Sequence, residues 1–275
     1  MMHKTLLDSV SLSGVGIHSG IKIQLTVSPG KPETGVRFFR SIENTWHSVP
    51  CDAHYAISAA RATLLEKEGI RIRTPEHVLS ALVGLGITCA DITLSDEEVP
   101  ILDGSAKSFT DAFLSVGFET LSPIDLPTIT TPITVQGPNG STATVLPDTE
   151  RRFTFLLHFD NPNIGYQYYS FVWTPDGYLN DIAPARTFGF YHEVQALQAR
   201  GLALGGSLEN AVVIGDDGYM NALRFPDELV RHKILDLIGD MALVGTPFTG
   251  HVIGVASGHA LHAQLAQAIQ HQFAT

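Results

Sequence analysis

Two stretches of the sequence decide the fold: HVLSALVG at residues 77–84 and HKILDLIG at residues 232–239. With a shift of 155 residues between them, the histidine, one leucine and the glycine coincide, and two further positions are aliphatic in both. About 27 residues after each histidine, a Gly-x-Ala motif at residues 104–106 and 258–260 is expected to begin another helix. Short helical patterns also recur by chance. If the similarity reflects a duplication, it predicts two α+β halves whose equivalent helices meet and bring His77 close to His232.

The most proline-rich connector is SPIDLPTITTP at residues 122–132. Its three prolines forbid a continuous helix and indicate an extended link between the halves, so we expect domains at 1–124 and 125–275. Residues 21–27 alternate apolar and polar side chains, as a half-buried strand does. Further strands are expected near 36–39, 88–94, 132–136, 142–146, 152–159 and 166–173, and helices starting near 57, 75, 105, 190, 226 and 258.

Composition excludes several classes of protein. The chain has 275 residues, 17 of them basic and 28 acidic, for a net charge of −11, which argues against binding a nucleic-acid backbone. Two cysteines cannot build a disulfide framework and favour a reducing, cytoplasmic location. The N-terminus has no apolar run of signal-peptide length.

Residues 241–275 contain no Asp, Glu, Lys or Arg. Glycine, proline, histidine and glutamine interrupt this stretch too often for a transmembrane helix, so we expect a strand and a helix packed in a core. It also contains four histidines, His251, His259, His262 and His271. We expect three of these four to be solvated or to find hydrogen-bond partners within the core.

The strongest local signal is the helix predicted within FPDELVRHKILDLIGD at residues 225–240. Apolar residues form one stripe of this helix, while His232, Asp236 and Asp240 follow one another at i, i+4 spacing on the opposite stripe. Such a stripe is most often a solvated face. However, a histidine and an aspartate one turn apart can also bind a single metal ion.

A third metal ligand is available in TPEH at residues 74–77. Thr74 is expected to cap a helix whose first turn contains Pro75, Glu76 and His77. Two histidines and one carboxylate form a catalytic zinc site, because they leave the fourth position open for water. Glu76 is then placed to take a proton from that water, or it is a surface residue that complements the helix dipole.

Seven blocks in order along the chain resemble the UDP-3-O-acyl-N-acetylglucosamine deacetylase family: GVGIHSG at 14–20, TPEH at 74–77, ILDGSA at 101–106, ARTFGF at 185–190, GGSL at 205–208, RHKILDLIGD at 231–240 and SGHA at 257–260. The resemblance implies zinc-dependent hydrolysis of the N-acetyl group of UDP-3-O-(3-hydroxyacyl)-N-acetylglucosamine, with release of acetate. In Gram-negative bacteria this is the committed step of lipid A biosynthesis. With the internal similarity, it implies an α+β fold with two similar domains, each a small, mostly antiparallel sheet packed on helices, the helices of both domains being sandwiched between the sheets.

The resemblance also implies roles for individual residues. The Zn²⁺ ligands would be His77, His232 and Asp236. Glu76 would be the general base, His259 the protonated acid at the leaving amine, Asp240 the carboxylate that orients His259, and Thr187 a donor to the oxyanion. Substrate contacts would come from Lys233, Phe188, Leu202 and His18, with an insert near 190–213 forming an apolar passage for the acyl chain. His18 could instead satisfy a turn, and residues 201–206 could be a plain loop.

One position departs from the family pattern. Many members carry a basic residue three positions before the final catalytic histidine, where this chain has Ala256. Cations for the substrate diphosphate would then come from Lys233, Arg186 or Arg200, or from backbone amides. The expected partner is this small-molecule substrate, with no nucleic acid, no transmembrane segment and a monomeric chain. The alternatives are a zinc amidohydrolase for another acetylated sugar and a non-catalytic sugar-nucleotide-binding paralogue.

Overall fold

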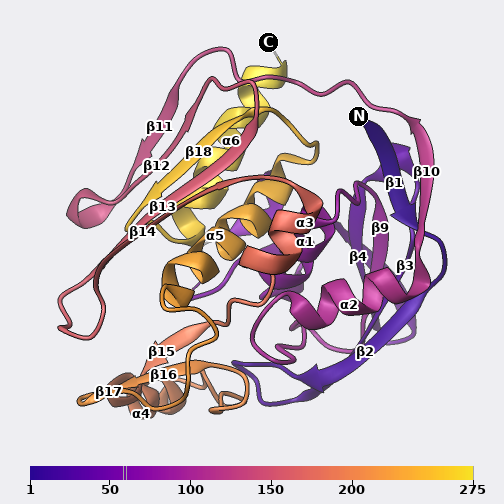
Figure 1. Cartoon of the computed structure of the whole chain (residues 1–275). Coiled ribbons are helices and arrows are strands. Elements are labelled where there is room, and N and C mark those ends of the chain that lie inside the picture. The colour runs from indigo at the N-terminus through magenta and orange to yellow at the C-terminus, as the bar shows by residue number, and fades with distance from the viewer. Residues whose placement is uncertain (58, 60, 275) are drawn as a thin grey trace.

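The computed structural model describes residues 1–57, 59 and 61–274. Two five-stranded sheets lie on opposite sides of the molecule, with helices between them (Figure 1). In spatial order, the first sheet contains β2 (Val10–Val15), β3 (Lys22–Pro29), β9 (Ala90–Leu94), β4 (Val36–Ile42) and β5 (Thr45–Pro50). The second contains β11 (Ile133–Gln136), β12 (Thr142–Leu146), β18 (Gly250–Val255), β13 (Arg151–Phe159) and β14 (Gly165–Val172).

The two sheets have the same connectivity. In each, the third strand in space is the last in sequence, and it pairs in parallel with the fourth: β9 with β4, and β18 with β13. All other neighbours in both sheets are antiparallel. This repetition confirms the predicted fold class of two similar, mostly antiparallel sheets packed on helices, while the division at 124/125 stays a prediction.

Four helices fill the space between the sheets: α1 (Glu76–Gly84), α2 (Lys107–Val116), α5 (Glu228–Met241) and α6 (His259–Ala274). The helices α1 and α5, which contain the two similar stretches, pack against each other at the centre. A Cβ atom at Gly239 would lie 2.0 Å from the backbone oxygen of Glu76, so only glycine permits this close approach. All residues of α5 except Arg231 and Lys233 are buried, as expected for a helix covered on several sides.

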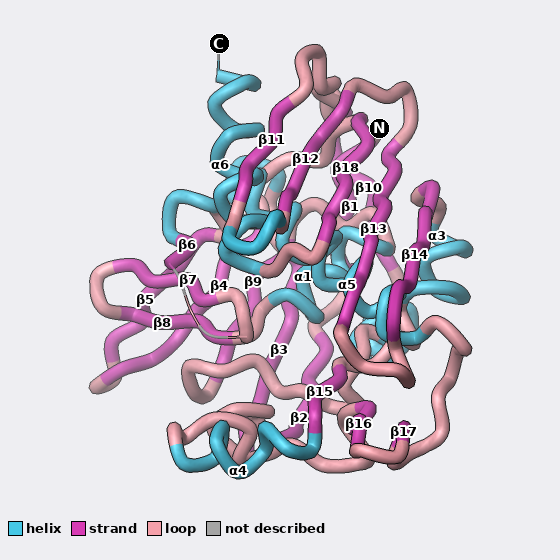
Figure 2. The backbone as a smooth tube through the Cα atoms, turned by 90° about the vertical axis from the view of Figure 1, so that its left-hand side faces the viewer, coloured by secondary structure: helices cyan, strands magenta, loops and turns pink. Residues whose placement is uncertain are grey.

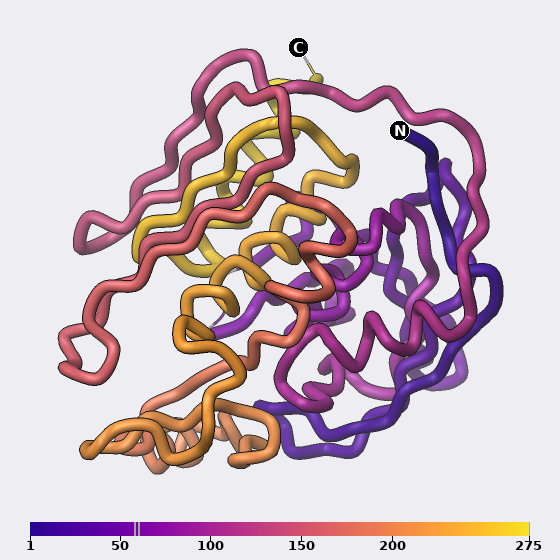
Figure 3. The backbone as a smooth tube through the Cα atoms, in the orientation of Figure 1, coloured from indigo at the N-terminus to yellow at the C-terminus, as the bar shows by residue number. Residues whose placement is uncertain are grey.

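The chain passes from the first half to the second along one edge of the molecule (Figure 3). Before this crossing, β10 (Phe118–Pro123) pairs with β1 (Met2–Leu6) in a two-stranded sheet. Each half also carries one small three-stranded sheet. The first is β6 (Ala56–Ile57), β7 (Leu64–Lys67) and β8 (Ile70–Arg73), and the second is β15 (Phe188–Phe190), β16 (Val212–Gly215) and β17 (Gly218–Tyr219).

The second of these small sheets, with α4 (Tyr191–Ala199), lies below the main body (Figure 2), and the loop after α4 contacts the turn between β2 and β3, where the Leu204 N–H donates to the His18 oxygen. This is the region of the predicted insert. The shortest α-helix, α3 (Pro175–Gly177), continues into a single π-helical turn over residues 178–182, and this turn packs against α5.

Most expected elements are present, and the charge-free tail forms the predicted strand and helix, β18 and α6. The prediction of a helix starting near residue 57 is wrong, because Ile57 pairs with Leu64 in a β-ladder and the strand β7 begins at Leu64. Residues 58 and 60 lie outside the described part of the chain. Within the described residues, no helix is both long and apolar enough to cross a membrane.

Candidate active site and metal centre

The site forms where α1, α5 and α6 meet. The first turn of α1 supplies Glu76 and His77, and successive turns of α5 supply His232, Asp236 and Asp240. All five side chains are buried. The stripe on α5 is therefore not a solvated face, because the α1 helix of the other half covers it.

Three of these side chains point at a common centre. The Nε2 atom of His232 lies 3.3 Å from Oδ1 of Asp236, and Nε2 of His77 lies 3.7 Å from the same oxygen. The two imidazole rings are perpendicular, with centroids 5.0 Å apart. All three ligand atoms lie within 4.8 Å of one another. Such an arrangement of two nitrogens and an oxygen is what a small divalent cation requires.

Hydrogen bonding, burial and charge keep these three groups in the protonation states that bind a metal ion. Nδ1 of His232 donates to the backbone oxygen of Ala185 at 3.0 Å, which leaves Nε2 with its lone pair toward the centre. Burial, with the neighbouring His232, lowers the pKa of His77 to about 3, and burial also lowers the pKa of His232. Burial alone would raise the pKa of Asp236, but His232 and Lys233 outweigh it and hold that pKa below its usual range. The set is neutral at both histidines and ionised at the aspartate.

Glu76 and His259 face each other beside this centre. Oε1 of Glu76 lies 3.8 Å from Nε2 of His259, and that nitrogen lies 4.0 Å from Oδ2 of Asp236. Burial raises the pKa of Glu76 to about 8. Burial alone would lower the pKa of His259, but Asp240 and Glu76 outweigh it and raise that pKa to about 9. The pair can therefore hold one proton on the imidazole and release or accept another at the carboxylate.

A second group of possible ligands, Asp240, His259 and His262, is linked by hydrogen bonds. Oδ2 of Asp240 lies 2.8 Å from Nδ1 of His259 and 2.7 Å from Nδ1 of His262. These are hydrogen-bond lengths. Hydrogen bonds of this length fix the three side chains relative to one another.

A cavity of about 840 Å³ opens onto these residues, within the range of small-molecule sites. Of the residues predicted to contact substrate or oxyanion, Thr187, Phe188, Lys233 and His18 line it. Leu202 does not, whereas Leu197 and Ala203 of the same segment do. The apolar part of the wall comes mainly from residues of β15, α4, the loop after α4, and β16: Phe188, Phe190, Val194, Leu197, Leu208 and Val213.

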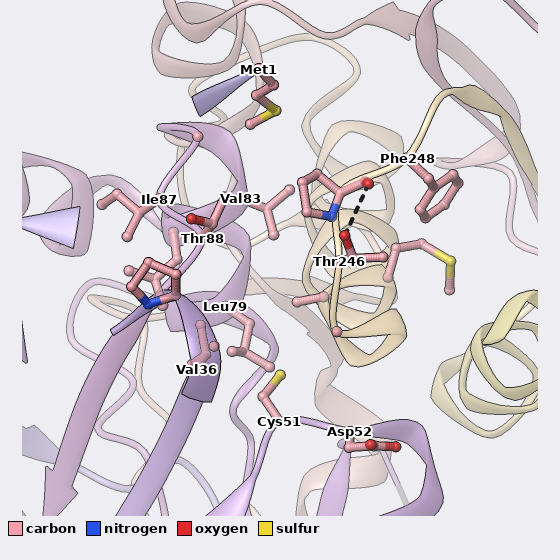
Figure 4. A pocket seen from close by; sticks show the side chains of 18 of the residues that line it. Met1, Val36, Cys51, Asp52, Leu79, Val83, Ile87, Thr88, Thr246 and Phe248 are labelled. Atoms are coloured by element: carbon pink, nitrogen blue, oxygen red, sulfur yellow. Dashed lines mark hydrogen bonds between the residues drawn. The ribbon is translucent and has the colours of Figure 1, made fainter. Parts of the chain in front are cut away.

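A smaller cavity of about 290 Å³ lies elsewhere, near the ends of α1 and α5. Leu79 and Val83 of α1 face it, with Cys51, Thr246 and Phe248 around them (Figure 4). Among the residues that the structure describes, none of the predicted site residues lines this second cavity. The chemical groups of the site therefore belong to the larger cavity.

The chain matches the family described as UDP-3-O-acyl N-acetylglycosamine deacetylase (LpxC) over residues 3–271. This chain belongs to that family. Its relatives include proteins named UDP-3-O-acyl-N-acetylglucosamine deacetylase from Leptospira biflexa serovar Patoc (42% identity, covering 98% of this chain and 90% of the relative), Nautilia profundicola (40%, 95% and 89%) and Myxococcus xanthus (39%, 97% and 85%). The family resemblance read from the sequence is confirmed, and with it the assignment as a deacetylase that hydrolyses an amide. Members of this family are metalloenzymes.

In this deacetylase, the glycine-rich block near the N-terminus forms one end of the cavity. The backbone N–H groups of His18 and Ser19 both donate to the carboxylate of Glu98 at 2.8 Å. A Cβ atom at Gly16 would lie 2.1 Å from that carboxylate, so a larger residue there would displace the Glu98 side chain. The insert docks on the same turn, since the Leu204 N–H donates to the His18 oxygen. Glu98 was not predicted from the sequence, because no local pattern links it to His18 and Ser19, about 80 positions earlier in the chain.

The cations near the cavity differ from those expected. Arg186 is buried, and its guanidinium donates to both carboxylate oxygens of Glu228, so it is not available to a diphosphate. Arg200 is exposed and does not line the cavity. Lys233 lines it and is paired with Asp236. Arg61, which sequence reasoning missed, also lines the cavity and is paired with Glu193 at 2.8 Å.

The residue expected to cap α1 has another partner. The Thr74 hydroxyl donates to Glu98 at 3.4 Å, and the residue before α1 is Pro75, with no side-chain cap. At the other end of the site, the Ser257 hydroxyl is 2.9 Å from Nε2 of His262. These two hydroxyl groups therefore hold neighbouring carboxylate and imidazole groups of the site.

Proposed function

We propose that this family member hydrolyses the N-acetyl group of UDP-3-O-acyl-N-acetylglucosamine, releasing acetate in the committed step of lipid A biosynthesis, and that Zn²⁺ is its metal. The observation that carries the proposal is the convergence of His77, His232 and Asp236 beside the facing pair Glu76 and His259, at one wall of a large cavity. The substrate is taken from the names of the relatives.

The donor set fits zinc. Two imidazole nitrogens and one carboxylate oxygen are ligands that Zn²⁺ accepts, and three protein ligands leave room for a reacting group. The His232 ring is held by a backbone carbonyl, which is the usual support for a ligand histidine. When bound there, the metal polarises the amide carbonyl and lowers the pKa of water.

Glu76 is proposed as the general base. Its carboxylate is buried next to the metal centre, and burial raises its pKa, which makes the ionised carboxylate a stronger base than an exposed one. A base must reach the proton it removes, and Glu76 lines the cavity beside His77. It would take a proton from the attacking water.

His259 is proposed as the acid that protonates the leaving amine. Its raised pKa keeps the imidazole protonated, and its Nδ1–H bond to Asp240 aims Nε2 at the site. Thr187 lines the same cavity and would donate its hydroxyl hydrogen to the oxyanion. The negative charge of Asp240 balances the positive charge of protonated His259, so the pair that supplies the proton is neutral overall.

The substrate would occupy the larger cavity, its acyl chain against the apolar wall that includes Phe188 and Leu197. Lys233 and His18 are proposed to contact the sugar nucleotide, because both line the cavity and carry polar groups. Leu202 is not retained in this role, since Leu197 and Ala203 line the cavity in its region. We also propose a cytoplasmic, monomeric enzyme.

The test is acetate release from UDP-3-O-acyl-N-acetylglucosamine by the metal-loaded protein, measured with and without a chelator. Zinc-dependent release supports the proposal, and no release by loaded protein rejects it. UDP-N-acetylglucosamine without the acyl chain is the matched comparison. Equal rates on both substrates would favour the alternative, a zinc amidohydrolase for another acetylated sugar, because the apolar wall would then serve no purpose.

A further inference from the structure

His262 lies one helical turn after His259 on α6, and it is fully buried. It does not line the substrate cavity. Both of its ring nitrogens nevertheless have polar partners inside the protein: Nδ1 with Asp240 and Nε2 with Ser257. A histidine that only filled the core would need no such link to the site.

Asp240 is held through both carboxylate oxygens. Oδ2 accepts from Nδ1 of His259 at 2.8 Å and from Nδ1 of His262 at 2.7 Å. Oδ1 accepts from the Thr63 hydroxyl at 2.5 Å. A carboxylate with a donor on each oxygen cannot rotate without breaking a bond. Its orientation is therefore fixed independently of His259.

The partners of His262 determine its tautomer. Asp240 is ionised, since His259 and the hydrogen bonds to it outweigh burial and lower its pKa to about 2. Its oxygen can only accept, so Nδ1 of His262 must donate. Nε2 of the neutral ring then accepts from the Ser257 hydroxyl. Neutral His262 holds Asp240 without adding a second positive charge beside His259.

We propose that His262 is a positioning residue of the reaction, which holds the Oδ2 atom of Asp240 so that the shared carboxylate keeps His259 aimed at the substrate. The inference rests on the proposed function. Phe155 packs edge-on to the His262 ring, with centroids 6.3 Å apart, and keeps it in this orientation. Ser257 at the start of α6 and Thr63 in the other half complete the support for one carboxylate.

The experiment compares His262→Asn with His262→Leu. Asparagine places an amide N–H near the position of Nδ1, whereas leucine has similar bulk and no donor. We expect His262→Leu to lower kcat about 10- to 100-fold, because a loosened catalytic group misses its productive geometry. KM and bound zinc should stay at wild-type values, and His262→Asn should recover most of kcat. His271→Leu, in the last turn of the same helix, is the matched control, since His271 is exposed.

A second readout does not depend on turnover. Imidazole N–H protons hydrogen-bonded to a carboxylate give downfield proton NMR signals, and two are expected here, from His259 and His262. In His262→Asn the signal of His259 should persist, and in His262→Leu it should broaden through exchange. Wild-type protein that releases no acetate would reject the proposed function, while these signals would still report whether His262 orders the Asp240 pair.

Three results would overturn the inference. Wild-type kcat in His262→Leu would show that the donor is unnecessary. Equal loss of kcat in the Asn and Leu variants would show that only the shape of the ring matters. Loss of zinc from His262→Leu would show a structural effect on the metal centre.

Discussion

His259 donates its Nδ1 hydrogen to Oδ2 of Asp240 at 2.8 Å, across 19 residues and between two different helices. Asp240 is 1% exposed, so water does not compete for this bond. A buried carboxylate at this distance stabilises the imidazolium and fixes its direction. Asp240 belongs to the helix that carries His232 and Asp236. However, it is not one of the three proposed zinc ligands, which are His77, His232 and Asp236.

Replacement of Asp240 by asparagine should therefore lower turnover and leave zinc in place. The amide keeps the size of the side chain but removes the charge that raises the pKa of His259. We expect kcat to fall by about 100-fold or more, the scale of a lost acid–base contribution. Acetate release and zinc content per protein are the measurements. A variant as active as wild type would remove the role proposed for Asp240.

Replacement of Glu76 by glutamine tests the proposed base. Glutamine is nearly isosteric and cannot accept the proton, so kcat should fall about 100- to 10,000-fold while KM and bound zinc change little. Glu97 offers a matched control, because it is a carboxylate that pairs with Arg73 and does not line the cavity. If Glu76→Gln kept wild-type kcat, another group would have to accept the proton.

Removal of the metal tests the ligand set. Exhaustive chelation should abolish acetate release, and added Zn²⁺ should restore it. Binding to the folded state alone also raises stability, so the metal-free protein should melt at a lower temperature. His232→Ala should bind no zinc and show the same melting temperature with and without added metal, whereas His271→Ala should behave as wild type. Undiminished activity in metal-free protein would contradict the assignment.

The apolar wall gives a prediction about the acyl chain. Leu197 of α4 lines the cavity, and its neighbour Ala196 is exposed and does not. Leu197→Asp places a charge where the chain should lie, so KM for the acylated substrate should rise about tenfold or more. Ala196→Asp should leave KM unchanged, and Leu202→Asp should have a smaller effect than Leu197→Asp. Equal KM values in the Leu197 and Ala196 variants would show that α4 does not contact the chain.

The sequence predicted those features that local spacing determines. Alternating side chains at residues 21–27 marked the strand β3, and i, i+4 spacing put His232 and Asp236 on one face of α5. The short strands β15 and β16 escaped prediction, because each exists mainly through its pairing with the other.

The supports of the site could not be read in the same way. Thr63 reaches Asp240 across 177 residues, and no periodic pattern links the two. The Ser257 hydroxyl pairs with the ring of His262, a contact that no spacing pattern in the sequence indicated. Long-range hydrogen bonds of this kind depend on how the halves pack, which spacing within one helix does not encode.

The same carboxylate makes a prediction about stability and pH. Burial alone would raise the pKa of Asp240, but His259 and the hydrogen bonds from His259 and His262 outweigh it and lower the pKa to about 2, against 3.8 for the free side chain. A folded-state pKa below the unfolded value stabilises the fold above about pH 4, and this contribution is lost as pH falls toward 2. Since one pH unit of pKa change corresponds to about 1.4 kcal/mol, the contribution is about 2 kcal/mol.

The measurement compares metal-free wild type with metal-free Asp240→Asn by chemical denaturation between pH 5 and about pH 2. Other carboxylates titrate in both proteins, so they cancel in the difference between the two free energies of unfolding. That difference should be largest at pH 5 and shrink by about 2 kcal/mol toward pH 2, because only the wild type has a charge to lose at this position. A difference that stays constant over this range would mean that Asp240 is not held ionised by His259 and His262 in the folded protein.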